Sequence, residues 1–152
     1  KSWLEISAHV FRLAGIYGPD RSSLSRLKSD LKKRIDYPGH LFSRIHVDDI
    51  AQTILASLNH PNPGQIYNLS DDEPVEQQVV EAYAASLLGI DPPPLVAFNE
   101  AVKDMSPIAQ TFWQDNRRID NSKIKNEFGI KLIYPSYREG LKAIHQSTEN
   151  TG

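Results

Sequence analysis

The chain has 152 residues, a formal net charge of −2 and no cysteine; 39% of its residues are hydrophobic and 24% are charged. These values are typical of one ordinary globular domain, and the small net charge gives no general reason to expect binding to nucleic acid or to an anionic membrane. The lack of cysteine excludes disulfides, thiolate metal sites and cysteine nucleophiles. The lack of cysteine also fits a reducing compartment, so we expect a cytoplasmic protein. The sequence has no apolar run near the roughly 20 residues of a membrane span.

The first element is the apolar run HVFRLAGI, residues 9–16, which ends at the turn YGPDR. Such a run predicts a strand inside a sheet that is covered on both faces. The sequence has only one other strong strand, over residues 65–70, whereas a stable sheet normally needs three or more strands. Because residue 1 is also lysine rather than methionine, we expect the chain to be part of a longer domain.

Residues 21–45 show weaker patterns: a polar stretch over 21–35, a turn, and a possible short strand over 41–45. The next segment, HVDDIAQTILASLNH, predicts an amphipathic helix with Asp48 and Asp49 in its first turn, where the helix dipole favours anions. The apolar stripe of this helix consists of Ile50, Ala51, Ile54, Leu55 and Leu58.

The helical spacing of apolar residues after DDEP predicts a helix that ends at Gly89. Further along, we expect a stiff connector at 92–94 and a short strand at 95–98. We then expect a helix with Ser106 as N-cap and Pro107 as first residue, followed by a short helix ended by Gly129. The capping-box pair Ser136 and Glu139 opens the last helix, and a frayed tail begins at Ser147. Strands that alternate with helices indicate an α/β fold with parallel pairing. We expect residues 9–16 and 65–69 to be parallel neighbours, linked by a crossover through the helix at 47–58.

The sequence contains no phosphate-binding or nucleophile motif. Its glycines form neither G-x-G-x-x-G nor a P-loop, and no G-x-S-x-G is present. His46, Asp48 and Asp49 are metal-binding residue types, but side chains at a helix start point apart and no second histidine follows at ligand spacing, so we expect no metal. The basic residues between Arg26 and Arg34 have no interleaved aromatic residues, and we interpret them as a solvated surface.

Three segments carry a family resemblance in the right order: RLAGIYGP (12–19), SRIHVDDIAQ (43–52) and IYNLSDDEPV (66–75). Together with YPSYREGL (134–141), they resemble the C-terminal half of the extended short-chain dehydrogenase/reductases, the NAD(P)-dependent epimerase/dehydratase family. The resemblance implies that residues 1–152 form the C-terminal part of a Rossmann-like parallel sheet plus the smaller substrate-binding subdomain, without the N-terminal dinucleotide-binding portion.

In that family, the earlier strands carry the glycine-rich turn, the acidic ribose-binding residue and the Tyr-x-x-x-Lys catalytic pair. No tyrosine in this sequence has lysine four residues later; Tyr17 and Tyr134 have arginine there. We therefore assign no catalytic residue and expect the chain alone to be inactive. NAD or NADP is the expected cofactor of a complete family member, and we expect this chain alone to bind neither tightly.

The resemblance places the wall of the site on this chain. The implied cofactor-binding residues, which approach the nicotinamide chiefly through backbone, are Leu13, Ala14 and Gly15. The implied substrate-binding residues are Tyr17, Gly18, Pro19, Arg44 and His46. Many family members have asparagine where this chain has Gly15, so a sugar-hydroxyl contact is not carried over to that position. For His46, a hydrogen bond at the helix start is preferred over a catalytic role.

These features favour the substrate-side portion of an NAD(P)-dependent epimerase/dehydratase-like oxidoreductase. The alternative is a non-catalytic truncated module that binds a ligand or assembles with another chain, so the sequence leaves open whether the chain is an enzyme. The expected partners are a small, sugar-like substrate and either further copies of the chain or a separate chain that supplies the missing half. Neither the substrate nor the choice between NAD and NADP follows from the sequence.

Overall fold

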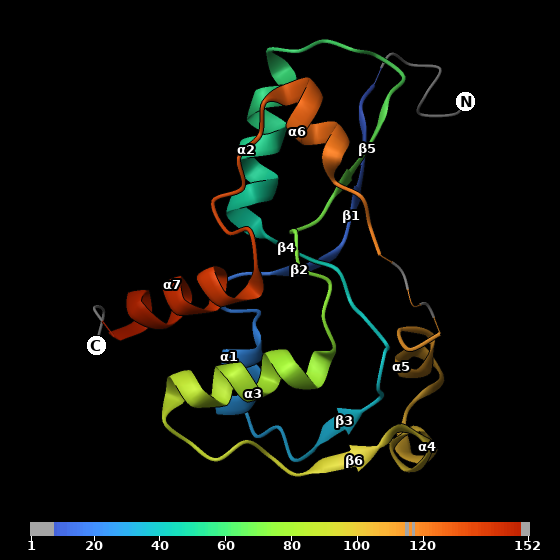
Figure 1. Ribbon diagram of the computed structural model, residues 1–152, viewed down its shortest axis with the longest axis vertical. Helices are drawn as coiled ribbons and strands as arrows, with labels where there is room; N and C mark the ends of the chain where they lie inside the picture. Colours follow the sequence, from blue (N-terminus) through green and yellow to red (C-terminus); the bar gives the residue numbers. More distant parts are fainter. Residues whose placement is uncertain (1–7, 115, 117, 150–152) are drawn as a thin grey trace.

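The computed structural model describes residues 8–114, 116 and 118–149. Within these residues, parallel strand pairs organise the fold (Figure 1). The pairs are β1 (Val10–Leu13) with β5 (Ile66–Leu69), β2 (Gly15–Tyr17) with β4 (Arg44–His46), and β3 (Arg34–Asp36) with β6 (Leu95–Ala97). Helices connect and cover these pairs, so the predicted α/β class with parallel pairing is confirmed.

Residues 9–16, expected as one strand, form parts of two. Ala14 lies between β1 and β2: its amide donates to the Leu69 carbonyl at 3.0 Å, whereas the Gly15 amide donates to the Ser43 carbonyl at 3.1 Å. The chain therefore changes its partner from β5 to β4 at this point. An apolar pattern reports burial and not the identity of the neighbour, so the sequence could not show the break. The expected parallel pairing is confirmed for residues 10–13, which pair with residues 66–69, whereas residues 15–16 pair with β4 instead.

The first core lies between the β1–β5 pair and two helices, α2 (Val47–Leu58) and α6 (Ser122–Phe128). Helix α6 contacts both β5 and α2, and Figure 1 shows it beside them. The buried side chains of this core are Ile45, Tyr67, Leu69, Ile124, Phe128 and Ile130. Helix α2 is also the connection that carries the chain from β4 to β5, as expected for a parallel crossover.

Helix α2 turns a polar side inward. Its buried residues are Asp49, Thr53 and Ser57, whereas Ile54, Leu55 and Leu58 are 43%, 64% and 73% exposed. We call these three exposed residues the outer stripe of α2. The predicted helix is confirmed, but most of its apolar stripe does not face the core of the described residues. The inward carboxylate of Asp49 accepts hydrogen bonds from the amides of Ile133 at 2.7 Å and Tyr134 at 3.0 Å, which fixes this orientation.

The second core lies between three helices, α1 (Ser23–Lys28), α3 (Gln77–Leu88) and α7 (Tyr137–Glu149), which contact one another. It consists of Tyr17, Leu24, Leu27, Val80, Ala84, Ala85, Tyr137, Leu141 and Ile144. Gly140 brings α7 onto the ring of Tyr17, because a Cβ at this position would lie 2.1 Å from the Tyr17 hydroxyl. This core therefore joins the end of β2 to the C-terminal helix.

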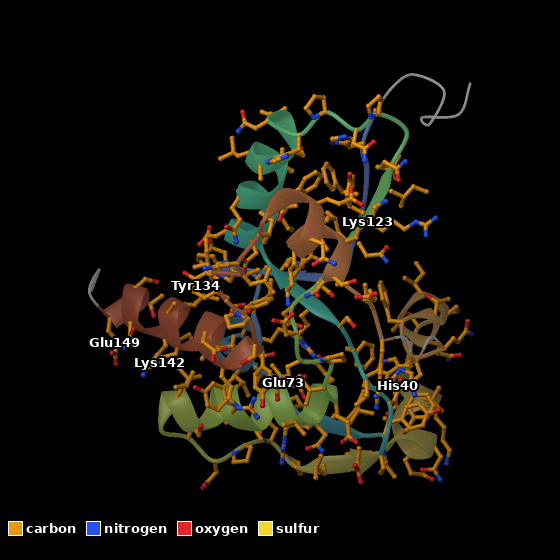
Figure 2. The ribbon with its side chains drawn as sticks, turned by 45° about the horizontal axis from the view of Figure 1, so that its top comes forward. His40, Glu73, Lys123, Tyr134, Lys142 and Glu149 are labelled. Atoms are coloured by element: carbon orange, nitrogen blue, oxygen red, sulfur yellow. The ribbon has the colours of Figure 1, made fainter. Side chains whose placement is uncertain are left out.

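The third region combines the β3–β6 pair with α4 (Phe98–Ala101), the 3₁₀ helix η2 (Val102–Asp104) and α5 (Pro107–Thr111). An aromatic cluster holds it together, with Tyr37 stacked between Phe98 and His40 at centroid distances of 4.2 and 4.7 Å. Trp113 and Phe42 complete the cluster. His40 is labelled beside α4 and α5 in Figure 2. The expected strand at 95–98 is present but ends at Ala97.

Helix ends follow the sequence closely. Ser106 caps α5, and Gly89 and Gly129 end α3 and α6 with left-handed backbone. The Ser136 amide donates to the Glu139 carboxylate at 3.0 Å, and the Arg138 amide donates to the Ser136 hydroxyl at 3.1 Å, so the predicted capping pair is confirmed. In the described part of the chain, no helix has both the length and the apolar character needed to cross a membrane.

The expected frayed tail is wrong for residues 147–149, which belong to α7. The hydroxyls of Ser147 and Thr148 donate back to carbonyl groups of the preceding turn, including that of Ile144. These bonds let polar residues continue the helix. The rest of the expected tail lies outside the described residues.

Candidate functional site

A cleft with a volume of about 1100 Å³ opens beyond the carboxyl end of β1. Its floor is the β1–β2 segment from Leu13 to Tyr17. The walls come from residues 20–29 around α1, the segment 41–44, α3, α5 and α7. Parallel α/β sheets commonly bind their ligands beyond the carboxyl ends of the strands, so this cleft is the candidate functional site.

The three residues expected to bind cofactor all line this cleft: Leu13, Ala14 and Gly15. The amides of Ala14 and Gly15 already donate within the protein, to Leu69 and Ser43. The Leu13 side chain is 44% exposed, and a Cβ at Gly15 would lie 3.3 Å from the Ser43 carbonyl oxygen. The floor of the cleft therefore presents an exposed apolar side chain beside a residue without a side chain.

Of the residues expected to bind substrate, Tyr17 and Arg44 line the cleft, whereas Gly18, Pro19 and His46 are not among its lining residues. Gly18 forms a tight turn with Arg21 through paired backbone hydrogen bonds of 3.0 and 3.1 Å. Pro19 is exposed within that turn. The structure therefore brings together five of the eight expected residues and leaves these three beside or beneath the site.

His46 is buried and serves as the N-cap of α2. Its Nδ1 accepts a hydrogen bond from the Asp48 amide at 3.2 Å, which is the expected bond at the helix start. The rings of Tyr17 and Tyr134 pack on it, with centroids at 5.0 and 4.1 Å. Burial lowers the pKa of His46, although the charges of Asp48 and Asp49 oppose this shift.

The Arg44 guanidinium is buried in the wall of the cleft. One of its terminal nitrogens, Nη1, donates to the carbonyls of Phe42 at 2.8 Å and Val75 at 3.2 Å; the other, Nη2, donates to Oε1 of Gln77 at 2.7 Å. Burial lowers the pKa of Arg44, and the charges of Asp71 and Glu81 oppose that shift. Arg44 therefore ties the segment before α2 to the start of α3.

Asp71 lies two residues after the end of β5, and its amide donates to the Arg44 carbonyl at 2.6 Å. It is 2% exposed, and neither of its carboxylate oxygens has a well-aligned hydrogen-bond donor among the described residues. Burial raises the pKa of Asp71 to about 7, although the charge of Arg44 and nearby backbone amides lower it. Sequence reasoning missed this residue, and the only signal was its place at the carboxyl end of a predicted strand.

Glu81 is a second buried carboxylate that sequence reasoning missed, because it stands among the apolar residues of α3. It is 2% exposed and pairs with Nη1 of Arg26 at 3.1 Å. Its Oε1 also accepts a hydrogen bond from Gln77 at 3.0 Å. Burial raises the pKa of Glu81, and these partners lower it. Arg26, Glu81, Gln77 and Arg44 thus form one connected polar chain along the cleft wall.

No family model matches the sequence. The chain is 29% identical over 129 residues to protein YeeZ of Escherichia coli K12, a match that covers 85% of this chain and 42% of YeeZ. It is 52% identical, with a TM-score of 0.86, to a functionally unknown conserved protein from Silicibacter pomeroyi DSS, over 91% of this chain and 49% of that one. The chain thus spans less than half the length of YeeZ and about half that of the Silicibacter protein.

A second solved structure identifies the fold. The chain matches a dTDP-glucose 4,6-dehydratase from Bacillus anthracis, solved in complex with NAD, with 22% identity and a TM-score of 0.69. The match covers 93% of this chain and 44% of the dehydratase. The chain therefore has the fold of part of a Rossmann-type dehydratase, which confirms the predicted fold class.

Proposed function

We propose that residues 1–152 are the substrate-side, C-terminal portion of an NAD(P)-dependent epimerase/dehydratase-like oxidoreductase. The observation that carries this proposal is the cleft, because it places Leu13, Ala14 and Gly15 together with Tyr17 and Arg44 around one volume beyond the carboxyl end of β1. The dehydratase fold and the ordered family motifs support the same assignment.

In the complete protein, the surface from Leu13 to Gly15 contacts the nicotinamide end of NAD or NADP. The nicotinamide, when bound, exchanges a hydride with a substrate carbon. Tyr17 forms the adjoining wall of the substrate pocket, and its hydroxyl donates to the Ser136 carbonyl at 3.4 Å. Arg44, on the neighbouring strand β4, fixes the cleft wall through its hydrogen bonds to Phe42, Val75 and Gln77. Acid–base catalysis comes from a Tyr-x-x-x-Lys pair that this sequence lacks.

The test is a fluorescence titration with NADH and NADPH, performed on this chain and on a longer product of its gene that includes the dinucleotide-binding portion. We expect the longer protein to bind one of the two cofactors and to transfer hydride, and we expect this chain alone to do neither, because the glycine-rich turn supplies much of the anchoring. Hydride transfer by the purified chain, or failure of the longer protein to bind either cofactor, would overturn the proposal.

The alternative, a non-catalytic module that assembles with another chain, has two observations in its favour. The outer stripe of α2 is exposed, and among the described strands β1 pairs with β5 on one side only. An unpaired strand edge and an apolar helix face are both suited to a protein partner. A second copy of this chain or a separate chain with the missing strands would fit these surfaces.

A further inference from the structure

Positive charge predominates in the lining of the candidate cleft. Its charged residues are Asp20, Arg21, Arg26 and Arg44. Three cations against one anion attract ligands of negative charge, and the low dielectric of the cleft walls strengthens this attraction. The lining therefore favours a ligand that carries an acidic group.

Two of these arginines can reach a ligand. The Arg21 side chain is exposed, and no carboxylate of the described residues lies within ion-pair distance of it. Arg26 is 53% exposed, although its Nη1 lies 3.1 Å from the carboxylate of Glu81. Because a guanidinium has five N–H donors, Arg26 can keep this pair and still donate to a second acid. Arg44, in contrast, is buried and donates to partners within the protein.

Apolar side chains form another part of the lining, which we call the apolar wall. The Trp113 ring packs on the Phe42 ring with a centroid distance of 5.1 Å. The Ile119 amide donates to the Ser43 hydroxyl at 3.3 Å. These contacts bring two segments distant in sequence side by side, and the cleft residues on them that make up the apolar wall are Leu41, Phe42, Phe112 and Ile119.

Phe112 is the most exposed member of the apolar wall. It is the C-cap of α5, and it is 68% exposed. The next residue, Trp113, is packed against Phe42, so the segment that carries Phe112 is anchored. Removal of apolar surface from water is favourable, and covering a ring on an anchored segment costs little conformational freedom. A ligand with an apolar body therefore gains affinity at this wall, whereas one that places hydroxyl groups there does not.

We infer that the cleft binds an organic anion with an apolar body, whose acidic group is held by Arg21 and Arg26 and whose apolar part covers Phe112. The volume of about 1100 Å³ is large enough for a small molecule of this kind. The inference rests on the proposed function, because it names the substrate class of the same site. This class differs from the sugar-like substrate that the family resemblance implies.

The experiment compares two fluorescent probes that share one ring system. Anilinonaphthalene sulfonate is an organic anion with an apolar body, and phenylnaphthylamine is the same molecule without the sulfonate. Each probe is titrated into the chain at low and at high salt. Each titration is repeated in the background Leu55→Gln, Leu58→Gln, because the outer stripe of α2 is a competing apolar surface.

The variants separate the apolar part of the ligand from its charge. Phe112→Ser removes the exposed ring, and Phe112→Leu keeps an apolar side chain. The matched control is Ile108→Ser, because Ile108 lies on the same helix, is 73% exposed and is not among the lining residues. Arg21→Gln removes a charge from the lining, and its control is Arg12→Gln, an exposed arginine of β1 outside the lining. Circular dichroism establishes that each variant is folded.

We expect Phe112→Ser to weaken both probes by about 5-fold or more and Phe112→Leu to recover most of this loss, because both probes cover the ring. Arg21→Gln should weaken only the sulfonate, by about 2-fold or more. High salt should also weaken only the sulfonate. The two controls should change neither affinity by more than about 1.5-fold.

Equal effects of Phe112→Ser and Ile108→Ser would overturn the inference. An affinity for the sulfonate that neither salt nor Arg21→Gln changes more than it changes that for phenylnaphthylamine would overturn it as well. The proposed function is decided separately, because its test is dinucleotide binding by the longer protein, whereas these titrations contain no dinucleotide.

Discussion

Some single residues of this chain lower its folding stability because the packing around them buries an ionisable group. Asp71 and Glu81 are acids of ordinary appearance in the sequence, yet the structure buries both of them beside arginines. Burial of a carboxyl group favours its neutral form. Ionising these groups beneath the candidate site therefore costs stability, and burial raises the pKa of both, most clearly for Asp71.

Substitution of Asp71 by asparagine should remove a pH-dependent loss in the free energy of unfolding. The pKa of Asp71 rises from its usual 3.8 to about 7 in the folded chain, so the folded state binds more protons than the unfolded state between these values. The stability from this group is fully present below pH 3.8 and is lost as the pH rises towards 7.

We therefore expect Asp71→Asn to be more stable than the unaltered chain at pH 8, by roughly 1–4 kcal/mol, and less different from it near pH 4. Urea unfolding at several pH values measures the difference, with the exposed Asp91→Asn as control. An unchanged pH profile in Asp71→Asn would show that this carboxyl is ionised in the folded chain throughout.

At the scale of elements, the sequence predicts helices within single segments well, but it predicts poorly which strands pair with one another. The helices α2, α3, α5, α6 and α7 have periodicity or caps that belong to the segment itself, and they are present. The division of residues 9–16 at Ala14 depends on which strand lies alongside, which no local pattern records. The polar stretch 21–35 contains α1 and part of β3, whose buried residues are too few to produce a clear period.

The residues of the candidate site also fall into a group that the sequence predicted and a group that it did not. Leu13, Ala14, Gly15, Tyr17 and Arg44 line one cleft, and they came from family motifs rather than from periodicity. The polar chain through Gln77 and Glu81 joins three elements that are distant in sequence. A contact of this kind is a property of tertiary packing, so residue spacing alone does not predict it.

The contact between α7 and β2 gives a sharp element-scale prediction. In Gly140→Ala the new methyl group would meet the Tyr17 hydroxyl, so either α7 or the tyrosine must move. We expect a loss of about 1–3 kcal/mol in the free energy of unfolding, since overpacking a core usually costs this much. Urea unfolding measures it.

The control for this variant is Lys142→Ala, on the same helix but exposed (Figure 2). Its effect should stay within about 0.5 kcal/mol. If Gly140→Ala were as stable as Lys142→Ala, the close packing of α7 on Tyr17 would be wrong.

At the scale of the whole molecule, exposed apolar surface is the main feature. The outer stripe of α2 and the Leu13 side chain are apolar and exposed, while β1 presents a second edge to which no described strand pairs. Such surfaces favour association with a second copy or with a chain that supplies further strands.

We expect the isolated chain to self-associate at micromolar concentrations in sedimentation velocity. The double substitution Leu55→Gln and Leu58→Gln should shift it towards monomer with little change in folding stability, because both side chains are exposed. Ile108→Gln on α5 is the matched control, since Ile108 is as exposed as Leu58, at 73%. A well-behaved monomer of the unaltered chain, with cooperative unfolding, would contradict this expectation.

The parallel pairing has a consequence for how the protein is made. Val10 in β1 can pair only after Ile66 in β5 has been synthesised, and Arg34 in β3 can pair only after Leu95 in β6 has been synthesised. Ribosomes add about 5–20 residues per second, so β1 leaves the exit tunnel several seconds before β5 is available. During that interval β1 lacks its partner strand β5, and pairings between distant segments form slowly. We therefore expect the yield of folded protein in a cell to depend on the pace of translation between these strands and on chaperones that shield the first of them.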